Sequence, residues 1–252
     1  MKRTIICLMT MLALSVSVAF AGTPLSYIQI TKNHVRLQVG QSRTLYVQYE
    51  PKNTTDDKTV VWSSDKENIA TVENGVVTAK SEGVATITAV CGKHEGVCHV
   101  RVIGKDGYVD ATPMYNLLNG FRAEKTWQWK KGSKSKKYFN TNKKNRLKPL
   151  KRNAKLEKAA QTRAREITKK YSHKRPNGKK WYTAYPKMSL RGENLVVCSD
   201  PVRAFEGLKE THSKYKYQGH RRNMLNKGFN SVGIAGYRKN GEIYWVMSFG
   251  KK

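Results

Sequence analysis

The sequence contains few acidic residues. Of its 252 residues, 18 are Asp or Glu and 48 are Lys or Arg, so the formal net charge is +30. The excess lies in one half: residues 22–103 hold 9 basic and 8 acidic side chains, whereas residues 104–252 hold 37 and 10. The segment Lys125–Lys155 has 13 basic residues and no acidic one. Such a surface attracts polyanions through counterion release. We therefore expect anionic cell-surface or extracellular polymers as partners and no specific nucleic-acid partner. A solvated basic face that aids solubility is the alternative.

After residue 21 the sequence also lacks an apolar run long enough to cross a bilayer, which takes about 20 residues. The first residues differ: Lys2-Arg3 precedes the apolar run Ile5–Val18, and Ala19-Phe20-Ala21 follows it. This order predicts a signal peptide over residues 1–21, cleaved after Ala21, rather than a membrane anchor. We therefore expect a secreted chain, extracellular or periplasmic, with no transmembrane span after cleavage.

Cysteine is scarce, and the predicted mature chain keeps only Cys91, Cys98 and Cys198. Export permits disulfides. Cys91 and Cys98 flank the segment 93–96, which resembles a hairpin tip, so we predict that they face each other across two strands as a disulfide. Cys198 would then be buried or a free thiol, and the other pairings stay open.

Residues 25–103 have the pattern of an all-β domain. Val35, Leu37 and Val39 alternate with polar residues, which is the period of a strand. Asn74-Gly75 separates two β-branched runs, which predicts a hairpin. Short strands at regular spacing favour a β-sandwich.

The order of motifs in this half closely resembles the bacterial immunoglobulin-like domain, group 2. The residues that carry the resemblance are Leu37-x-Val39-Gly40, Val61-Trp62-Ser63-Ser64-Asp65, Gly75-x-Val77-Thr78-Ala79 and Gly83-x-Ala85-x-Ile87. The resemblance implies an immunoglobulin-like sandwich over residues 22–103 that serves as a spacer or adhesive module. We expect no site at His34, His94 or His99, because they are scattered.

A polar stretch, 104–111, predicts a linker, and helical periodicity follows it. Thr112-Pro113 marks a helix start with Thr at the N-cap, and Asn153 caps a second predicted helix. Asp200-Pro201 opens a third helix, on which Glu206 and Glu210 would share one face.

A strong hairpin signal comes last, with its turn at Asn240-Gly241. Helices beside a strand pair favour an α+β domain over residues 112–252.

The candidate site lies in this second domain. Only three histidines follow residue 103, at positions 173, 212 and 220. His173, Glu193, Glu210 and His220 would supply two imidazoles and two carboxylates. Imidazoles bind transition metals, and carboxylates orient them or complete the ligand set. His–Glu pairs also transfer protons. The spacing along the chain matches no compact ligand motif, so the residue types leave both interpretations open.

The surrounding motifs resemble the CAP superfamily, also called SCP-like, which includes cysteine-rich secretory proteins, antigen 5 and pathogenesis-related 1 proteins. They are Ser172-His173-x-x-Pro176-x-Gly178, Gly192-Glu193-Asn194-Leu195, Gly219-His220-Arg221-x-Asn223 and Tyr244-Trp245-Val246. The resemblance is to the bacterial branch, covers about 112–250 and implies an α-β-α sandwich. It also implies that His173, Glu193, Glu210 and His220 line a cleft that in some members binds a divalent metal, often zinc. His212 is a spare candidate, and the basic segment 125–146 looks like an insertion that edges the cleft.

These features favour a binding site over an enzyme. No Ser or Cys nucleophile motif accompanies the histidines, and catalytic zinc usually has three protein ligands. We expect an exported two-domain protein whose cleft binds a divalent metal or a small ligand. One alternative is a metal-dependent hydrolase of peptide or envelope substrate, with Glu193 or Glu210 as the base. Another is a basic adhesin for anionic polymers.

Overall fold

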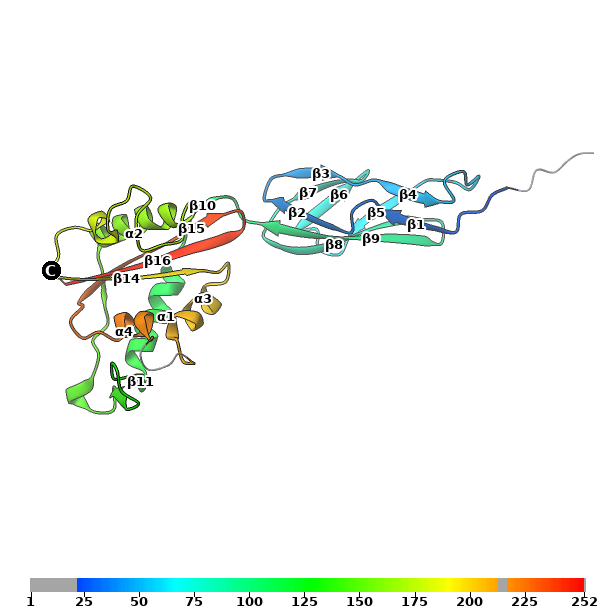
Figure 1. Cartoon of the computed structure of the whole chain (residues 1–252). Coiled ribbons are helices and arrows are strands. Elements are labelled where there is room, and N and C mark those ends of the chain that lie inside the picture. Colours follow the sequence, from blue (N-terminus) through cyan, green and yellow to red (C-terminus); the bar gives the residue numbers. More distant parts are fainter. Residues whose placement is uncertain (1–21, 213–216, 252) are drawn as a thin grey trace, which may run out of the picture. The chain divides into compact units, whose positions relative to one another are not determined.

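The computed structural model describes residues 22–212 and 217–251, so the predicted signal peptide lies outside the described residues. The chain divides into two compact units (Figure 1). The first comprises residues up to Lys80 and Val84–Arg101, and the second comprises Ser81–Gly83 and residues from Val102 onward. Within the described ranges no helix is long and apolar enough to cross a membrane.

The first unit consists of strands only, as its alternating pattern predicts. A four-stranded sheet has the order β2-β9-β8-β5, a three-stranded sheet has the order β3-β7-β6, and β1 pairs with β4. Ala85, Ile87 and Val100 are fully buried and alternate with half-buried or exposed residues, so the apolar faces form the core of a sandwich. The strands are β1 Tyr27–Ile30, β2 His34–Gln38, β3 Ser42–Thr44, β4 Val47–Glu50, β5 Val61–Ser64, β6 Ala70–Glu73, β7 Val76–Ala79, β8 Gly83–Cys91 and β9 His94–Ile103.

The predicted Cys91–Cys98 disulfide is wrong. Strand β8 ends at Cys91 and β9 begins at His94, so only Gly92 and Lys93 form the turn. Cys98 therefore lies four residues beyond the start of β9, which at 3.3 Å per residue is about 13 Å along the strand. A disulfide needs Cα atoms within about 7 Å. Both thiols are buried, and all three cysteines in the described part of the chain are free.

The second unit has the α-β-α arrangement that the family resemblance implies. Its sheet has the order β10-β15-β16-β14, with β13 beside β15 in parallel. Its elements are β10 Gly107–Val109, α1 Thr112–Ala123, β11 Thr126–Trp129, β12 Lys136–Phe139, η1 Lys143–Asn145, β13 Lys151–Arg152, α2 Ala154–Ile167, η2 Trp181–Ala184, β14 Leu190–Val197, α3 Pro201–Lys209, α4 Gly219–Met224, β15 Ser231–Lys239 and β16 Glu242–Lys251. Strand β10 lies inside the range expected as linker and pairs with β15.

Alternate residues of β16 face the two helical layers. Trp245 and Met247 are buried among side chains of α1, α3 and α4. Val246, between them, packs with Ala160 and Ala164 of α2. Figure 1 shows α2 on one side of the sheet and α1, α3 and α4 on the other. The period of two along the strand thus builds a core on each face of the sheet.

The helix starts follow the predicted caps, with one difference. Asn153 and Asp200 accept hydrogen bonds from backbone N–H groups in the first turns of α2 and α3. At α1, however, Ala111 is the N-cap and Thr112 is the first helical residue, because the Thr112 N–H is satisfied by Asp110.

Candidate functional site

The site is built on β14, the edge strand of the sheet. Successive side chains of a strand point to opposite faces. Glu193 therefore faces α2, as Leu195 does, whereas Asn194 faces the layer that holds α4. Gly192, which precedes them, has no room for a side chain, since a Cβ there would lie 2.8 Å from the Phe229 ring. An edge strand leaves one side unpaired, so residues from both helical layers can reach Glu193 and Asn194.

Glu193 is a buried carboxylate paired with a buried guanidinium. Nε of Arg163 lies 2.8 Å from Oε2 of Glu193 and Nη2 lies 3.3 Å from Oε1. The Arg163 side chain is 0% exposed and the Glu193 side chain 1%. A charge pair without water contact is tolerated only where hydrogen bonds satisfy both groups. The fork geometry of arginine supplies two of those bonds here.

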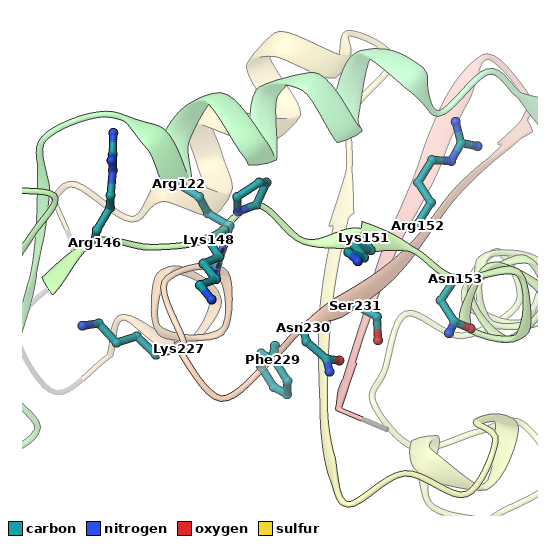
Figure 2. Close-up of a pocket in the computed structure, with 11 residues that line it drawn as sticks. Arg122, Arg146, Lys148, Lys151, Arg152, Asn153, Lys227, Phe229, Asn230 and Ser231 are labelled. Atoms are coloured by element: carbon teal, nitrogen blue, oxygen red, sulfur yellow. Dashed lines mark hydrogen bonds between the residues drawn. The ribbon is translucent and has the colours of Figure 1, made fainter. Parts of the chain in front are cut away.

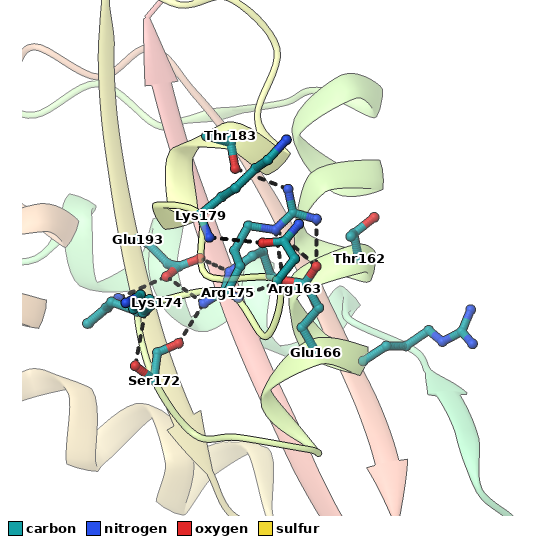
Figure 3. A network of polar contacts seen from close by, with 12 residues as sticks. Thr162, Arg163, Glu166, Ser172, Lys174, Arg175, Lys179, Thr183 and Glu193 are labelled. Carbon is teal, nitrogen blue, oxygen red and sulfur yellow. Dashed lines mark hydrogen bonds and ion pairs between the residues drawn. The ribbon is translucent and has the colours of Figure 1, made fainter.

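Arg163 also anchors the chain that follows α2. Its Nη1 lies 2.7 Å from Oε2 of Glu166, and its Nη2 donates to the Ser172 carbonyl at 2.7 Å (Figure 3). Nη2 of Arg175 donates a hydrogen bond to Oε1 of the same Glu166 carboxylate at 2.6 Å. Burial alone would raise the pKa of Glu166, but the hydrogen bonds from Arg175 and Arg163 outweigh it and lower that pKa. This network holds the loop that carries His173.

His173 meets Glu193 at the end of the network. Its Nδ1 lies 2.8 Å from Oε1 of Glu193, and its side chain is 53% exposed. Both oxygens of Glu193 are thus engaged, by Arg163 and by the imidazole. With Nδ1–H donating to the carboxylate, Nε2 is the nitrogen of His173 that has a lone pair to offer.

His220 and Glu210 form a second pair of the same kind on the other helical layer. Nδ1 of His220 lies 3.0 Å from Oε1 of Glu210, and the His220 N–H donates to Oε2 at 3.1 Å. The predicted shared face of Glu206 and Glu210 is wrong. Helix α3 ends at Lys209, and Glu210 is its C-cap with a left-handed φ of 48°. That reversal turns Glu210 toward the start of α4, while Glu206 pairs with Lys209.

Two asparagines join the two pairs. Nδ2 of Asn194 donates to the His220 carbonyl at 3.0 Å. Nδ2 of Asn223, one turn further along α4, lies 2.8 Å from Oδ1 of Asn194 and 3.2 Å from the Glu193 carbonyl. Because Asn194 is the neighbour of Glu193, these bonds fasten α4 to the strand position that holds the first imidazole–carboxylate pair.

The basic segment 125–146 supports the second pair. Arg221, which is buried, donates to the Trp127 carbonyl at 2.6 Å and stacks its guanidinium on the Trp127 ring, 4.9 Å from the centroid. Gln218 accepts a hydrogen bond from the Trp129 N–H and donates to the Glu210 carbonyl. The β11–β12 hairpin therefore packs against the residues on either side of His220.

If the site held a metal, the two imidazoles would be its protein ligands. Among the residues that the structure describes, no three His, Cys, Asp or Glu side chains come together as a ligand group. Nε2 of His173 and of His220 would be the ligating atoms. Glu193 and Glu210 then occupy the outer position in which a carboxylate holds the other ring nitrogen. Two protein ligands would leave coordination positions for water or another ligand.

Four site residues were predicted, and the structure joins them as two imidazole–carboxylate pairs, whereas the spare His212 is exposed. Sequence reasoning missed the role of Arg163. The sequence could have indicated this role, because a charged residue within the apolar face of Ala159, Ala160 and Ala164 implies a buried partner. Asn194 and Asn223 appear in the sequence only as parts of the family motifs, which do not predict the hydrogen bonds that they form.

Comparisons with known proteins agree with this architecture. Residues 25–101 match the model of the bacterial Ig-like domain (group 2). No curated protein matches the chain. Among solved structures, an outer surface protein from Borrelia burgdorferi is 17% identical, with a TM-score of 0.42, over 59% of this chain and 99% of its own. Schistosoma mansoni venom allergen-like protein 4 is 15% identical, with a TM-score of 0.39, over 55% of this chain and 86% of its own.

NaASP2, whose structure was determined with Zn²⁺, is 18% identical, with a TM-score of 0.35, over 56% of this chain and 80% of its own. At these identities and TM-scores the three structures carry no argument about function. The family model is more informative: residues 115–249, more than half of the 252, match the cysteine-rich secretory protein family, CAP. The chain therefore belongs to the cysteine-rich secretory protein (CAP) family and carries a bacterial Ig-like domain of group 2 before its CAP domain.

Proposed function

We propose that this chain is an exported binding protein whose CAP domain holds a divalent metal ion, zinc being the best suited, between His173 and His220. The Ig-like domain acts as a spacer or adhesive module. One observation carries the proposal: each imidazole has its Nδ1 within 3.0 Å of a carboxylate oxygen. That bond selects the tautomer with a free Nε2 lone pair, which is the form that binds zinc.

The geometry supports binding more than hydrolysis. A general base must be able to reach the proton it removes. Glu193 has both oxygens engaged by Arg163 and His173. Glu210 has one oxygen on the His220 ring and the other on the His220 N–H. These contacts favour a role for each carboxylate in orienting a ring over a role as base for water. A bound zinc would supply Lewis acidity and an exchangeable position for a small ligand.

Calorimetric titration of zinc into the chain that begins at Gly22 tests the proposal. The variant His173→Ala/His220→Ala should lose the zinc heat that the unaltered chain shows. His34→Ala/His99→Ala is the matched control, because it also removes two histidines, whose rings lie 5.3 Å apart between centroids in the Ig-like unit. Equal zinc binding by the unaltered chain and the cleft variant would refute the assignment. Export is checked separately by N-terminal sequencing of the secreted chain, which should begin at Gly22.

Replacing a carboxylate separates orientation from ligation. Glu210→Gln keeps a hydrogen-bond acceptor but removes the charge, so zinc affinity should fall roughly 10- to 100-fold, as for other outer partners of metal-binding histidines. A complete loss of binding, equal to that of the double histidine variant, would instead mean that Glu210 is itself a ligand.

A further inference from the structure

A cavity of the CAP domain is lined by residues other than those of the two imidazole–carboxylate pairs. It has a volume of about 660 Å³ and lies between the segment that leads through β13 into α2 and the loop that leads into β15. Figure 2 shows Arg146 and Lys227 toward one end, and Arg152 and Asn153 toward the other. We call this cavity the basic groove. Six cationic side chains line it: Arg122, Arg146, Lys148, Lys151, Arg152 and Lys227.

Among the described residues that line the basic groove, none is acidic. One cation, Arg152, is offset by Glu157, which lies 2.9 Å away. Arg122 is the opposite case: it is 1% exposed, and its hydrogen bonds run to backbone carbonyls, among them that of Lys148. Burial lowers the pKa of Arg122 to about 10, so it remains a cation at neutral pH. A buried positive charge whose hydrogen bonds go to carbonyls rather than to a carboxylate strengthens the attraction of this groove for anions.

Three exposed cations of the groove, Arg146, Lys148 and Lys151, form a row along one segment. Leu147 and Leu150 are buried and pin the segment to the core, while Arg146, Lys148 and Lys151 are exposed. An extended chain rises about 3.3 Å per residue, so the row from Arg146 to Lys151 spans about 16 Å. One phosphate or carboxylate cannot contact charges over that length. The row fits a linear anion with several charged groups.

The described lining of the groove offers no platform for nucleic-acid bases. Binding of single strands relies on exposed aromatic rings on which bases stack. The aromatic residue of this lining, Phe229, is 4% exposed, and its ring stacks on Phe249. Arginine forks and lysine ammonium groups are the usual partners of phosphate oxygens. The groove is therefore suited to phosphates rather than to bases.

We propose that the basic groove binds a linear chain of phosphate groups that carries no bases. Two sources share this chemistry: inorganic polyphosphate and a glycerol-phosphate polymer of a cell envelope. The site goes beyond the zinc site proposed above, because His173 and His220 do not line the groove. The proposal also assigns the expected binding of polyanions by the basic domain to one surface and to one class of polymer.

The test compares two triple variants of the full chain from Gly22 with equal change of charge. The groove variant is Arg146→Gln/Lys148→Gln/Lys151→Gln. The control is Lys130→Gln/Lys131→Gln/Lys134→Gln, in the basic loop between β11 and β12 and outside the groove lining. Thermal unfolding establishes that both variants fold. Dissociation constants are then measured over a series of salt concentrations with polyphosphate, poly(glycerol phosphate), oligo(dT) and heparin as probes.

We expect the groove variant to lose roughly tenfold or more in affinity for a phosphate-chain probe, with a shallower salt dependence, because fewer counterions are released. The control should lose no more than about threefold. Binding of only one phosphate-chain probe would identify the source, and binding of both would support the shared chemistry. Equal losses in the two variants would overturn the proposal, as would tighter binding of oligo(dT) or heparin than of either phosphate chain.

Discussion

The sharpest prediction concerns the buried charge pair of Arg163 and Glu193. Glu193→Gln keeps the shape of the side chain but removes its charge, and it leaves the Arg163 guanidinium, 0% exposed, without its main partner. Breaking a buried pair in this way costs about 3–5 kcal/mol. Because Glu166 still contacts Arg163 at 2.7 Å, we expect the lower end, about 3 kcal/mol. In a domain of this size that loss lowers Tm by about 10 °C.

Differential scanning calorimetry of the full chain measures this loss with an internal reference. The CAP unit should unfold at the lower temperature, while the transition of the Ig-like unit stays where it was, because Glu193 belongs to the second unit. Glu242→Gln is the charge-matched control, since that carboxylate is exposed and such changes usually cost less than about 0.5 kcal/mol. A CAP transition in Glu193→Gln within about 2 °C of that of Glu242→Gln would refute the claim that the pair is a structural centre of the site.

Three further predictions follow from single contacts. Gly233→Ala should prevent folding of the CAP unit, because a Cβ there would collide with the backbone of Leu156 and Glu157. The control Gly207→Ala, in α3 with nothing within 4 Å of the added Cβ, should stabilise the CAP unit by about 0.5–1 kcal/mol. A Gly233→Ala variant that is soluble and unfolds at the normal temperature would contradict this prediction. Burial alone would raise the pKa of Glu166, but the arginine hydrogen bonds outweigh burial and hold this pKa below its ordinary value of 4.5. The contacts of Glu166 therefore stabilise the fold fully above that pH, and this stabilisation is lost as the pH falls through the folded pKa. Glu166→Gln should accordingly flatten the decline of Tm between about pH 5 and pH 3, and an unchanged slope would argue against the network. Finally, thiol titration of the chain from Gly22, unfolded without reductant, should detect three thiols, since Cys91, Cys98 and Cys198 are all free. Detection of a single thiol would show that two of the cysteines form a disulfide.

Local patterns were sufficient for much of the fold. The period of two in β8 and β9, the Asn74-Gly75 and Asn240-Gly241 turns with their positive φ angles, and the caps at Asn153 and Asp200 depend on residues close together in the chain. Short-range sterics and hydrogen bonding set such features. The family motifs also placed His173 and His220 in one domain. Where a local pattern was ambiguous the prediction failed, as with the hairpin turn that separates Cys91 from Cys98.

The use of the carboxylates was decided only by the folded chain. Glu193 pairs with Arg163, 30 residues away in the chain. Glu210 turns toward His220 because α3 ends at Lys209 and Glu210 is its left-handed C-cap. Asn194 reaches His220 across 26 residues, because β14 lies at the edge of its sheet between two helical layers. Residue types and spacing are the same whether a glutamate is a base, a metal ligand or an orienting partner. The difference lies in which oxygen atoms are already bonded, and tertiary contacts determine that.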